Sequence, residues 1–193
     1  LEEDESIVVG KFERASRLAE EKGNINAQKD ILYNIAWYYH WWLNNDVGFE
    51  KYYTLYEKEV LKNNNIDDIM NLSNLWILAY TRKKRNKEDV KSKTQNILEL
   101  LNDQKKSKSR VVQLEAESRE CLIRILLKEN VDEQFKSLLN ITEEASKFKE
   151  FNFIILAKMI ENLLEVYGNN INYNQLYDLV TEKLSDRSSD IQK

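Results

Sequence analysis

Proline is absent from the 193 residues, and glycine occurs at only four positions, Gly10, Gly23, Gly48 and Gly168. Sheets and long loops normally need both residue types at their turns, so this composition excludes most β-rich folds. Asparagine stands at the breaks instead, for example at 44–45 and 63–65, and it tolerates the left-handed backbone in which helices end. The sequence therefore predicts an all-α fold.

Cysteine and histidine each occur once, as Cys121 and His40. A single cysteine excludes a disulfide framework within the chain. Neither a run of 18 apolar residues nor a basic-then-apolar leader occurs, so no membrane span and no secretory signal are predicted. We therefore expect a cytoplasmic protein. Because the first residue is Leu1 and not Met, we also expect the chain to be a segment of a larger protein.

Apolar residues recur at alternating spacings of three and four, which is typical of helices packed on one face. The polar residues Asn65 and Asn172 precede two of these patterns and are predicted N-caps. About nine antiparallel helices are predicted, at 4–22, 26–44, 47–63, 66–85, 87–103, 109–129, 131–147, 150–168 and 173–185.

A spacing of large and smaller apolar residues recurs about every 41 residues. It starts at Val8 and returns at Gly48, Val90, Val131 and Tyr173, and a more apolar helix lies between successive copies. This period indicates an array of helical hairpins, in which each hairpin buries its apolar faces against its neighbours. We therefore expect a single repeat domain over 1–185, followed by a polar tail at 186–193.

The stretch 12–65 resembles a tetratricopeptide repeat of the longer variety. The matching residues are Ile35, Ala36 and Tyr39 on the first helix, and Gly48, Tyr52 and Leu55 on the second. The other units depart from the motif, because Thr94 replaces an aromatic residue and the closing proline is absent. The resemblance implies a right-handed α-solenoid with a concave groove for ligands. Armadillo or HEAT-like helix pairs are the alternative.

The array begins on the second helix of a hairpin, so its first helix lacks the cover that a preceding helix would give. Val8, Val9, Phe12 and Leu18 carry the apolar surface left open. Self-association through this helix, or packing by another domain, is expected.

Half of the aromatic residues lie between 33 and 56. Since a helix turns about 100° per residue, their rings cannot share one face. Ile35, Tyr39 and Trp42 are predicted to meet the partner helix of the hairpin. A second face presents Tyr33, Trp37, His40 and Trp41. This second face either packs on the neighbouring hairpin or forms a binding surface, since Trp and Tyr concentrate at interaction hot spots.

No enzyme is predicted. His40 and Cys121 suggest a base and a nucleophile, but they lie about two repeats apart, a separation on the order of 20 Å from helix packing distances. Sequence motifs for dinucleotides, nucleotide phosphates, zinc and calcium are absent, so no cofactor and no metal site are predicted.

The segment 82–110 carries a net charge of +7, whereas the whole chain carries −4. Basic residues near helix C-termini are often no more than solvated turns, but a cluster can also bind phosphates or acidic peptides. The lack of an aromatic residue between 81 and 134 that could stack on a base argues against binding of nucleic acid. The patch consists of Arg82, Lys83, Lys84, Arg85, Lys87, Lys105, Lys106, Lys108 and Arg110.

The leading hypothesis is a scaffold that binds a protein or peptide in an aromatic-lined groove, with Trp37 and Trp41 as anchors. The predicted partner-binding residues are Asp30, Tyr33, Trp37, His40, Trp41, Tyr80 and Arg124. Two alternatives stay open. The chain could be a ligand-sensing domain of a larger regulator, like the peptide receptors of bacterial quorum sensing that the resemblance suggests. Alternatively, it could bind nucleic acid or an acidic partner through 82–110.

Overall fold

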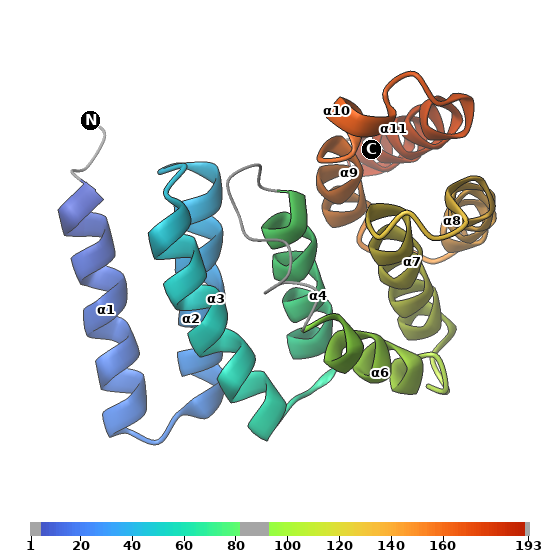
Figure 1. Cartoon of the computed structure of the whole chain (residues 1–193). Coiled ribbons are helices and arrows are strands. Elements are labelled where there is room, and N and C mark those ends of the chain that lie inside the picture. Colours follow the sequence, from blue (N-terminus) through green and yellow to red (C-terminus); the bar gives the residue numbers. More distant parts are fainter. Residues whose placement is uncertain (1–4, 82–92, 192–193) are drawn as a thin grey trace. The chain divides into compact units, whose positions relative to one another are not determined.

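The computed structural model describes residues 5–81 and 93–191, and within these ranges it contains helices and no strand, as the sequence predicts (Figure 1). The helices are α1 (Glu5–Glu21), α2 (Ile25–Trp41), α3 (Asp46–Lys62), α4 (Ile66–Thr81), α6 (Thr94–Gln104), α7 (Arg110–Leu126), α8 (Val131–Ala145), α9 (Phe153–Glu161), α10 (Leu164–Tyr167) and α11 (Ile171–Ile191).

Two predicted helices differ from those observed. The helix predicted over 150–168 is interrupted between α9 and α10, where Leu163 is fully buried while Leu164 is 57% exposed. The interruption also brings the Tyr167 hydroxyl within 2.9 Å of the Ile125 carbonyl, to which it donates. The last helix continues to Ile191 instead of ending at 185. Part of the helix predicted at 87–103 lies outside the described residues.

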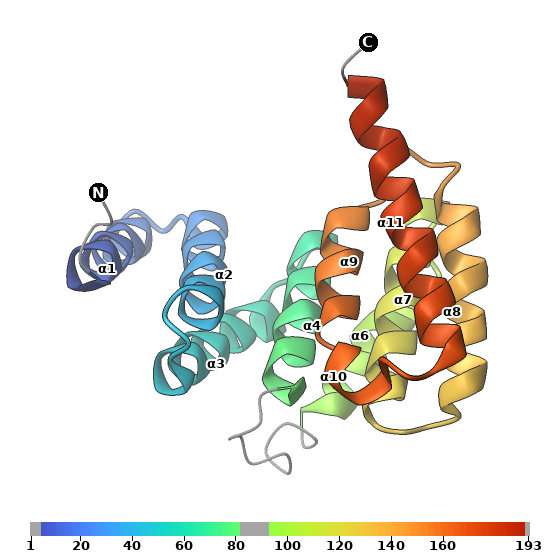
Figure 2. The same ribbon diagram turned by 90° about the horizontal axis from the view of Figure 1, so that it is seen from above.

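The chain forms two compact units, Leu1–Leu75 and Trp76–Lys193, and α4 crosses from one to the other. In the first unit α2 and α3 form an antiparallel hairpin, and α1 packs against α2 (Figure 1). In the second unit α7 contacts α6, α8 and α9, while α11 contacts α8 and α9 (Figure 2).

The helix starts repeat along the chain, which makes the fold repeat-like. The first helices of successive hairpins begin at Ile25, Ile66, Arg110 and Phe153, so they are spaced by 41 to 44 residues. Each start is capped by an asparagine or serine side chain that accepts a hydrogen bond from a backbone N–H of the first turn. These capping residues are Asn24, Asn65, Ser109 and Asn152. At the last helix the cap is Asn170 instead of the predicted Asn172.

Tyr39 fixes the α2–α3 hairpin. Its ring stacks on Tyr52 with centroids 5.5 Å apart, and it also lies directly over Gly48. A Cβ atom at position 48 would come within 2.2 Å of the Tyr39 ring carbons. The Tyr39 ring therefore leaves no room for a side chain at position 48, which explains why glycine stands there.

Gly48→Ala is expected to lower the free energy of unfolding by about 1–3 kcal/mol, because the Tyr39 ring must leave its stacked position. Gly10→Ala is the matched control. A Cβ atom at position 10 meets nothing within 4 Å, so alanine should raise the stability of α1 by about 0.5–1 kcal/mol. Urea unfolding followed by circular dichroism measures both, and a stabilising Gly48→Ala would contradict the packing of Tyr39.

Candidate partner-binding surfaces

Three aromatic rings follow one face of α2 at intervals of four residues, and we name Tyr33, Trp37 and Trp41 the α2 ridge. Ring centroids lie 5.7 Å apart between Tyr33 and Trp37, and 5.9 Å apart between Trp37 and Trp41. Residues four apart are neighbours on a helix surface, so the spacing alone produces the ridge. At its first end, Tyr33 lies 5.7 Å from the buried ring of Tyr56 on α3.

His40 joins the ridge to the core of the hairpin. Its ring meets Trp41 edge-on, with centroids 4.8 Å apart, and lies 5.6 Å from the fully buried Phe49. Trp41 remains 38% exposed, whereas Tyr33, Trp37 and His40 are half-buried. The structure thus brings these four predicted residues together, in a connected series of rings that reaches the surface at Trp41.

Asp30 lies one turn before the ridge on α2 and is exposed. Its backbone carbonyl accepts a hydrogen bond of 2.8 Å from the Asn34 side chain. The carboxylate therefore adds a negative charge near the buried end of the ridge.

Trp42 is not buried against α3, so that part of the prediction is wrong, although Ile35 is buried and Tyr39 packs on α3 as predicted. Trp42 is the C-cap of α2 and is 68% exposed. Its ring stacks back on Tyr38, 6.3 Å away, which in turn lies 6.1 Å from Phe12 of α1. As the C-cap, Trp42 follows the last helical residue of α2, and its indole is left largely in solvent.

Tyr80 and Arg124 belong to the second unit. Tyr80 stacks on the buried Trp76 at 5.1 Å, and burial raises the pKa of its hydroxyl. Tyr80 and Tyr167 line a small cavity of about 100 Å³. Arg124 donates to Glu120 at 2.8 Å and to Glu129 at 2.9 Å. A surface shared by these residues and the α2 ridge stays a prediction.

An open groove of about 580 Å³ runs along α7 and α8 in the second unit, and the sequence did not predict it. We name it the α7–α8 groove. Its lining residues are Lys105, Arg110, Glu117, Glu120, Cys121, Arg124, Gln134, Ser137, Asn140, Ile141 and Glu144. A polar side chain at every third or fourth position of α8 is the only signal in the sequence that could have indicated it.

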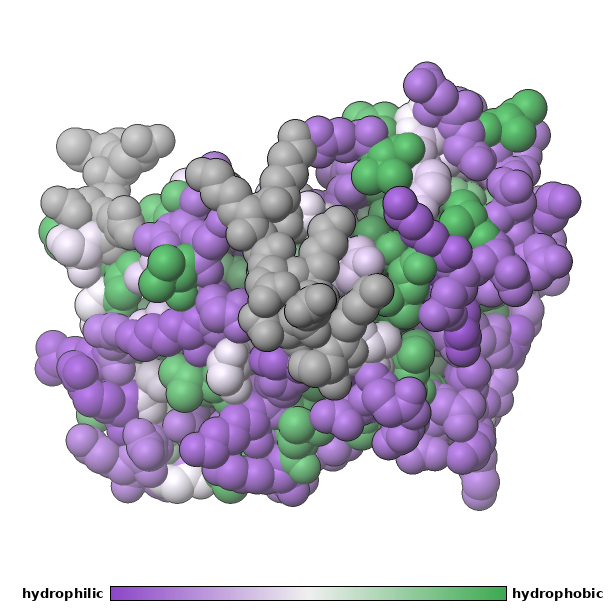
Figure 3. Space-filling view, viewed as in Figure 1, coloured by the Kyte–Doolittle hydropathy of each residue, from purple (hydrophilic) through white to green (hydrophobic). Residues whose placement is uncertain are grey.

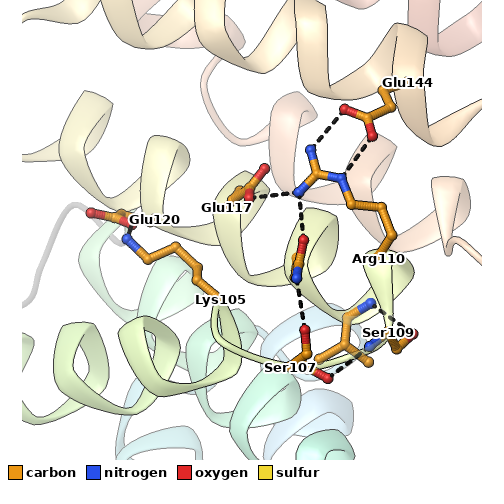
Figure 4. Close-up of polar contacts among 9 residues, drawn as sticks. Lys105, Ser107, Ser109, Arg110, Glu117, Glu120 and Glu144 are labelled. Atoms are coloured by element: carbon orange, nitrogen blue, oxygen red, sulfur yellow. Dashed lines mark hydrogen bonds and ion pairs between the residues drawn. The ribbon is translucent and has the colours of Figure 1, made fainter.

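Arg110 joins the two walls at one end of the groove (Figure 4). It donates two hydrogen bonds of 2.7 Å to the Glu144 carboxylate of α8 and one of 2.9 Å to Glu117 of α7. The hydrogen bonds from Arg110 lower the pKa of Glu144. A fourth bond reaches Gln113, whose amide donates to the carbonyl of Ser107, so the turn before α7 is held against Arg110.

Glu120 holds the cations near the other end. It accepts from Lys105 at 2.5 Å and from Arg124 at 2.8 Å. Burial raises the pKa of Glu120, but the hydrogen bonds from Lys105 and Arg124 outweigh burial, and the pKa lies below its ordinary value. The three cations and three carboxylates that line the groove are thus all paired, and together they carry no net charge.

The predicted basic patch is in part neutralised by these pairs. Lys105 and Arg110 bind glutamates, and Lys106 binds Asp103 at 2.7 Å. Lys108 is exposed. The other five members, from Arg82 to Lys87, lie outside the described residues. A phosphate bound at the described positions would have to compete with carboxylates already in place.

Cys121 lies in the wall of the α7–α8 groove and is buried, and burial raises the pKa of its thiol to about 12. Since the thiolate is the nucleophilic form, this environment does not activate the side chain. His40 belongs to the other unit and contacts Trp41 and Phe49.

The outer face of α1 exposes Ile7 and Leu18, which are 51% and 46% accessible, while Val8, Val9 and Phe12 are half-buried. On its visible face the first unit carries separate apolar spots among hydrophilic residues (Figure 3). These positions retain the apolar surface that the sequence predicts, but its role in self-association stays a prediction.

Comparisons with protein-family models, with curated proteins and with solved structures gave no match. Among the described residues, no helix has the length and apolar content that crossing a membrane requires.

Proposed function

We propose that the chain is a helical-repeat interaction module, of the tetratricopeptide type, that binds a protein or peptide through the α2 ridge. The observation that carries this proposal is the partly exposed Trp41 at the end of a connected series of rings. Support for the repeat type comes from the spacing of the helix starts and from Tyr39 packed on Gly48.

The ridge has the physical properties of a hot spot. Large aromatic side chains dominate the energetics of many interfaces, and they lose little conformational entropy when they are already fixed. Here each ring is held by the next one, and His40 is held by Phe49. Because these side chains are already ordered in the free protein, binding a partner costs little additional conformational entropy.

The shape of the ridge restricts the partner. Asp30 and Trp41 are separated along α2 by about 16 Å, from a rise of 1.5 Å per residue. A partner segment that places an apolar side chain against Trp41 and a basic side chain near Asp30 fits this spacing. About three turns of a helix, or about five extended residues, cover the distance.

Trp41→Ala is expected to weaken such binding by about 30-fold or more, which corresponds to a hot-spot loss of about 2 kcal/mol. Peptides of twelve residues are selected from a displayed random library on the full chain, and their dissociation constants are measured by fluorescence anisotropy. Trp42→Ala is the matched control, because it removes a more exposed indole from outside the ridge. It should change affinity by less than about threefold.

Circular dichroism of both variants separates lost binding from lost folding. If selected peptides bind Trp41→Ala as tightly as the unaltered chain, the α2 ridge is not the binding surface. An excess of basic residues in the selected peptides, reduced by Asp30→Asn, would support the orientation given above.

A further inference from the structure

We infer that the α7–α8 groove is a second binding site, which takes an extended polypeptide segment and binds its main chain through Gln134, Ser137 and Asn140. This site lies in the second unit and does not depend on the α2 ridge. Nothing in the proposed function above requires it.

The first argument is the state of the polar side chains on α8. Gln134, Ser137 and Asn140 line the groove, and within the described part of the chain their side chains make no hydrogen bond. Glu144, on the same face of α8, is instead fully engaged by Arg110. The groove thus combines a fixed, ion-paired end with a row of available donors and acceptors.

The second argument is charge. Lys105, Arg110 and Arg124 are paired with Glu117, Glu120 and Glu144, so the groove offers no surplus charge to an anion or a cation. Amide and hydroxyl side chains can donate and accept, which suits the alternating N–H and C=O groups of a peptide backbone. A neutral, amide-bearing ligand is therefore favoured over a phosphate.

The third argument is shape. Gln134 and Asn140 are about 9 Å apart along α8, from a rise of 1.5 Å per residue. This distance matches about three residues of an extended chain. The groove is also lined by Cys121 of α7 and Ile141 of α8, which are 7% and 9% exposed and give its wall a small apolar area against which one side chain of the segment can pack.

The test uses the full chain with the α2 ridge disabled by Trp37→Ala and Trp41→Ala. Peptides of eight residues are selected on this protein from a displayed random library, and their affinities are measured by fluorescence anisotropy. Asn140→Ala is expected to weaken binding about tenfold, as the loss of one or two hydrogen bonds in a groove does. Asn174→Ala, an exposed amide on α11, is the matched control and should change affinity by less than about twofold.

Two further readouts decide the assignment. In ¹⁵N spectra the side-chain amide signals of Gln134 and Asn140 should shift on titration with a selected peptide, and that of Asn174 should not. Affinity should change by less than about threefold between low and moderate salt, because no net charge is neutralised. No enrichment of peptides, affinity insensitive to Asn140→Ala and Gln134→Ala, or a steep salt dependence would each overturn the proposal, whatever the outcome at the α2 ridge.

Discussion

Lys29→Met is expected to lower the free energy of unfolding by about 3–5 kcal/mol, because it leaves a buried carboxylate without its counter-charge. Lys29 is 2% exposed, and its ammonium group binds the carboxylate of Asp68, whose side chain is 7% exposed. The same ammonium donates to the carbonyl of Asn63 at 3.1 Å. The pair therefore connects the N-terminal part of α2 to the first turn of α4 and to the turn between α3 and α4.

Asp68 has a second task at the start of α4. Its carboxylate accepts from the backbone N–H of Asn65 at 2.9 Å, while the Asn65 side chain accepts from the N–H of Asp68 at the same distance. This reciprocal cap requires an acceptor at position 68 but not a charge. The double variant Lys29→Met with Asp68→Asn should therefore recover part of the stability lost in the single variant.

Urea unfolding monitored by circular dichroism measures these changes. Lys62→Met is the control, since Lys62 is paired with Glu59 on the surface of α3 and its side chain is 58% exposed. Its removal should change the unfolding free energy by no more than about 0.5 kcal/mol. A cost below about 1 kcal/mol for Lys29→Met would mean that solvent reaches Asp68, in conflict with its burial.

The sequence predicted those features that depend on residues close together in the chain. Of the two N-caps predicted, Asn65 is observed and Asn172 is not, while the absence of proline and scarcity of glycine favoured helices throughout. The α2 ridge could also be predicted from the sequence, because a spacing of four aligns Tyr33, Trp37 and Trp41 on any helix. Which aromatic rings of α2 stay exposed depends on how α3 packs against them. The sequence therefore did not predict that Trp42 is exposed.

Features that join distant residues could not be predicted in the same way. Lys29 and Asp68 are 39 positions apart, and Arg110 and Glu144 are 34 apart. Asp68 stands in the first turn of α4, where the positive end of the helix dipole alone is enough to favour an acid. One signal was present, since Lys29 precedes the buried Leu32 and Ala36 by three and seven residues and so falls on the buried face of α2. A charged residue on that face requires a buried partner.

Phe135→Ala, in the second unit, is also expected to lower the free energy of unfolding by about 3–5 kcal/mol. Phe135 is fully buried on α8, and its ring meets those of Tyr167 at 5.5 Å and Tyr173 at 6.1 Å, both nearly edge-on. These contacts join α8 to α10 and α11, so a truncated side chain leaves a cavity where three helices meet. Because the surrounding rings are held by other contacts, including the hydrogen bond from Tyr167 to Ile125, they cannot collapse to fill it.

If packing is the cause, the loss in unfolding free energy should increase with the volume of buried side chain that is removed. Phe135→Leu keeps most of the apolar volume and should cost less than about 1.5 kcal/mol. Val166→Ala, at a site that is 64% exposed on α10, should change stability by no more than about 0.5 kcal/mol. Chemical denaturation of the three variants at one protein concentration gives the comparison. Equal losses for Phe135→Leu and Phe135→Ala would indicate that ring geometry, and not buried volume, holds α8 against α10 and α11.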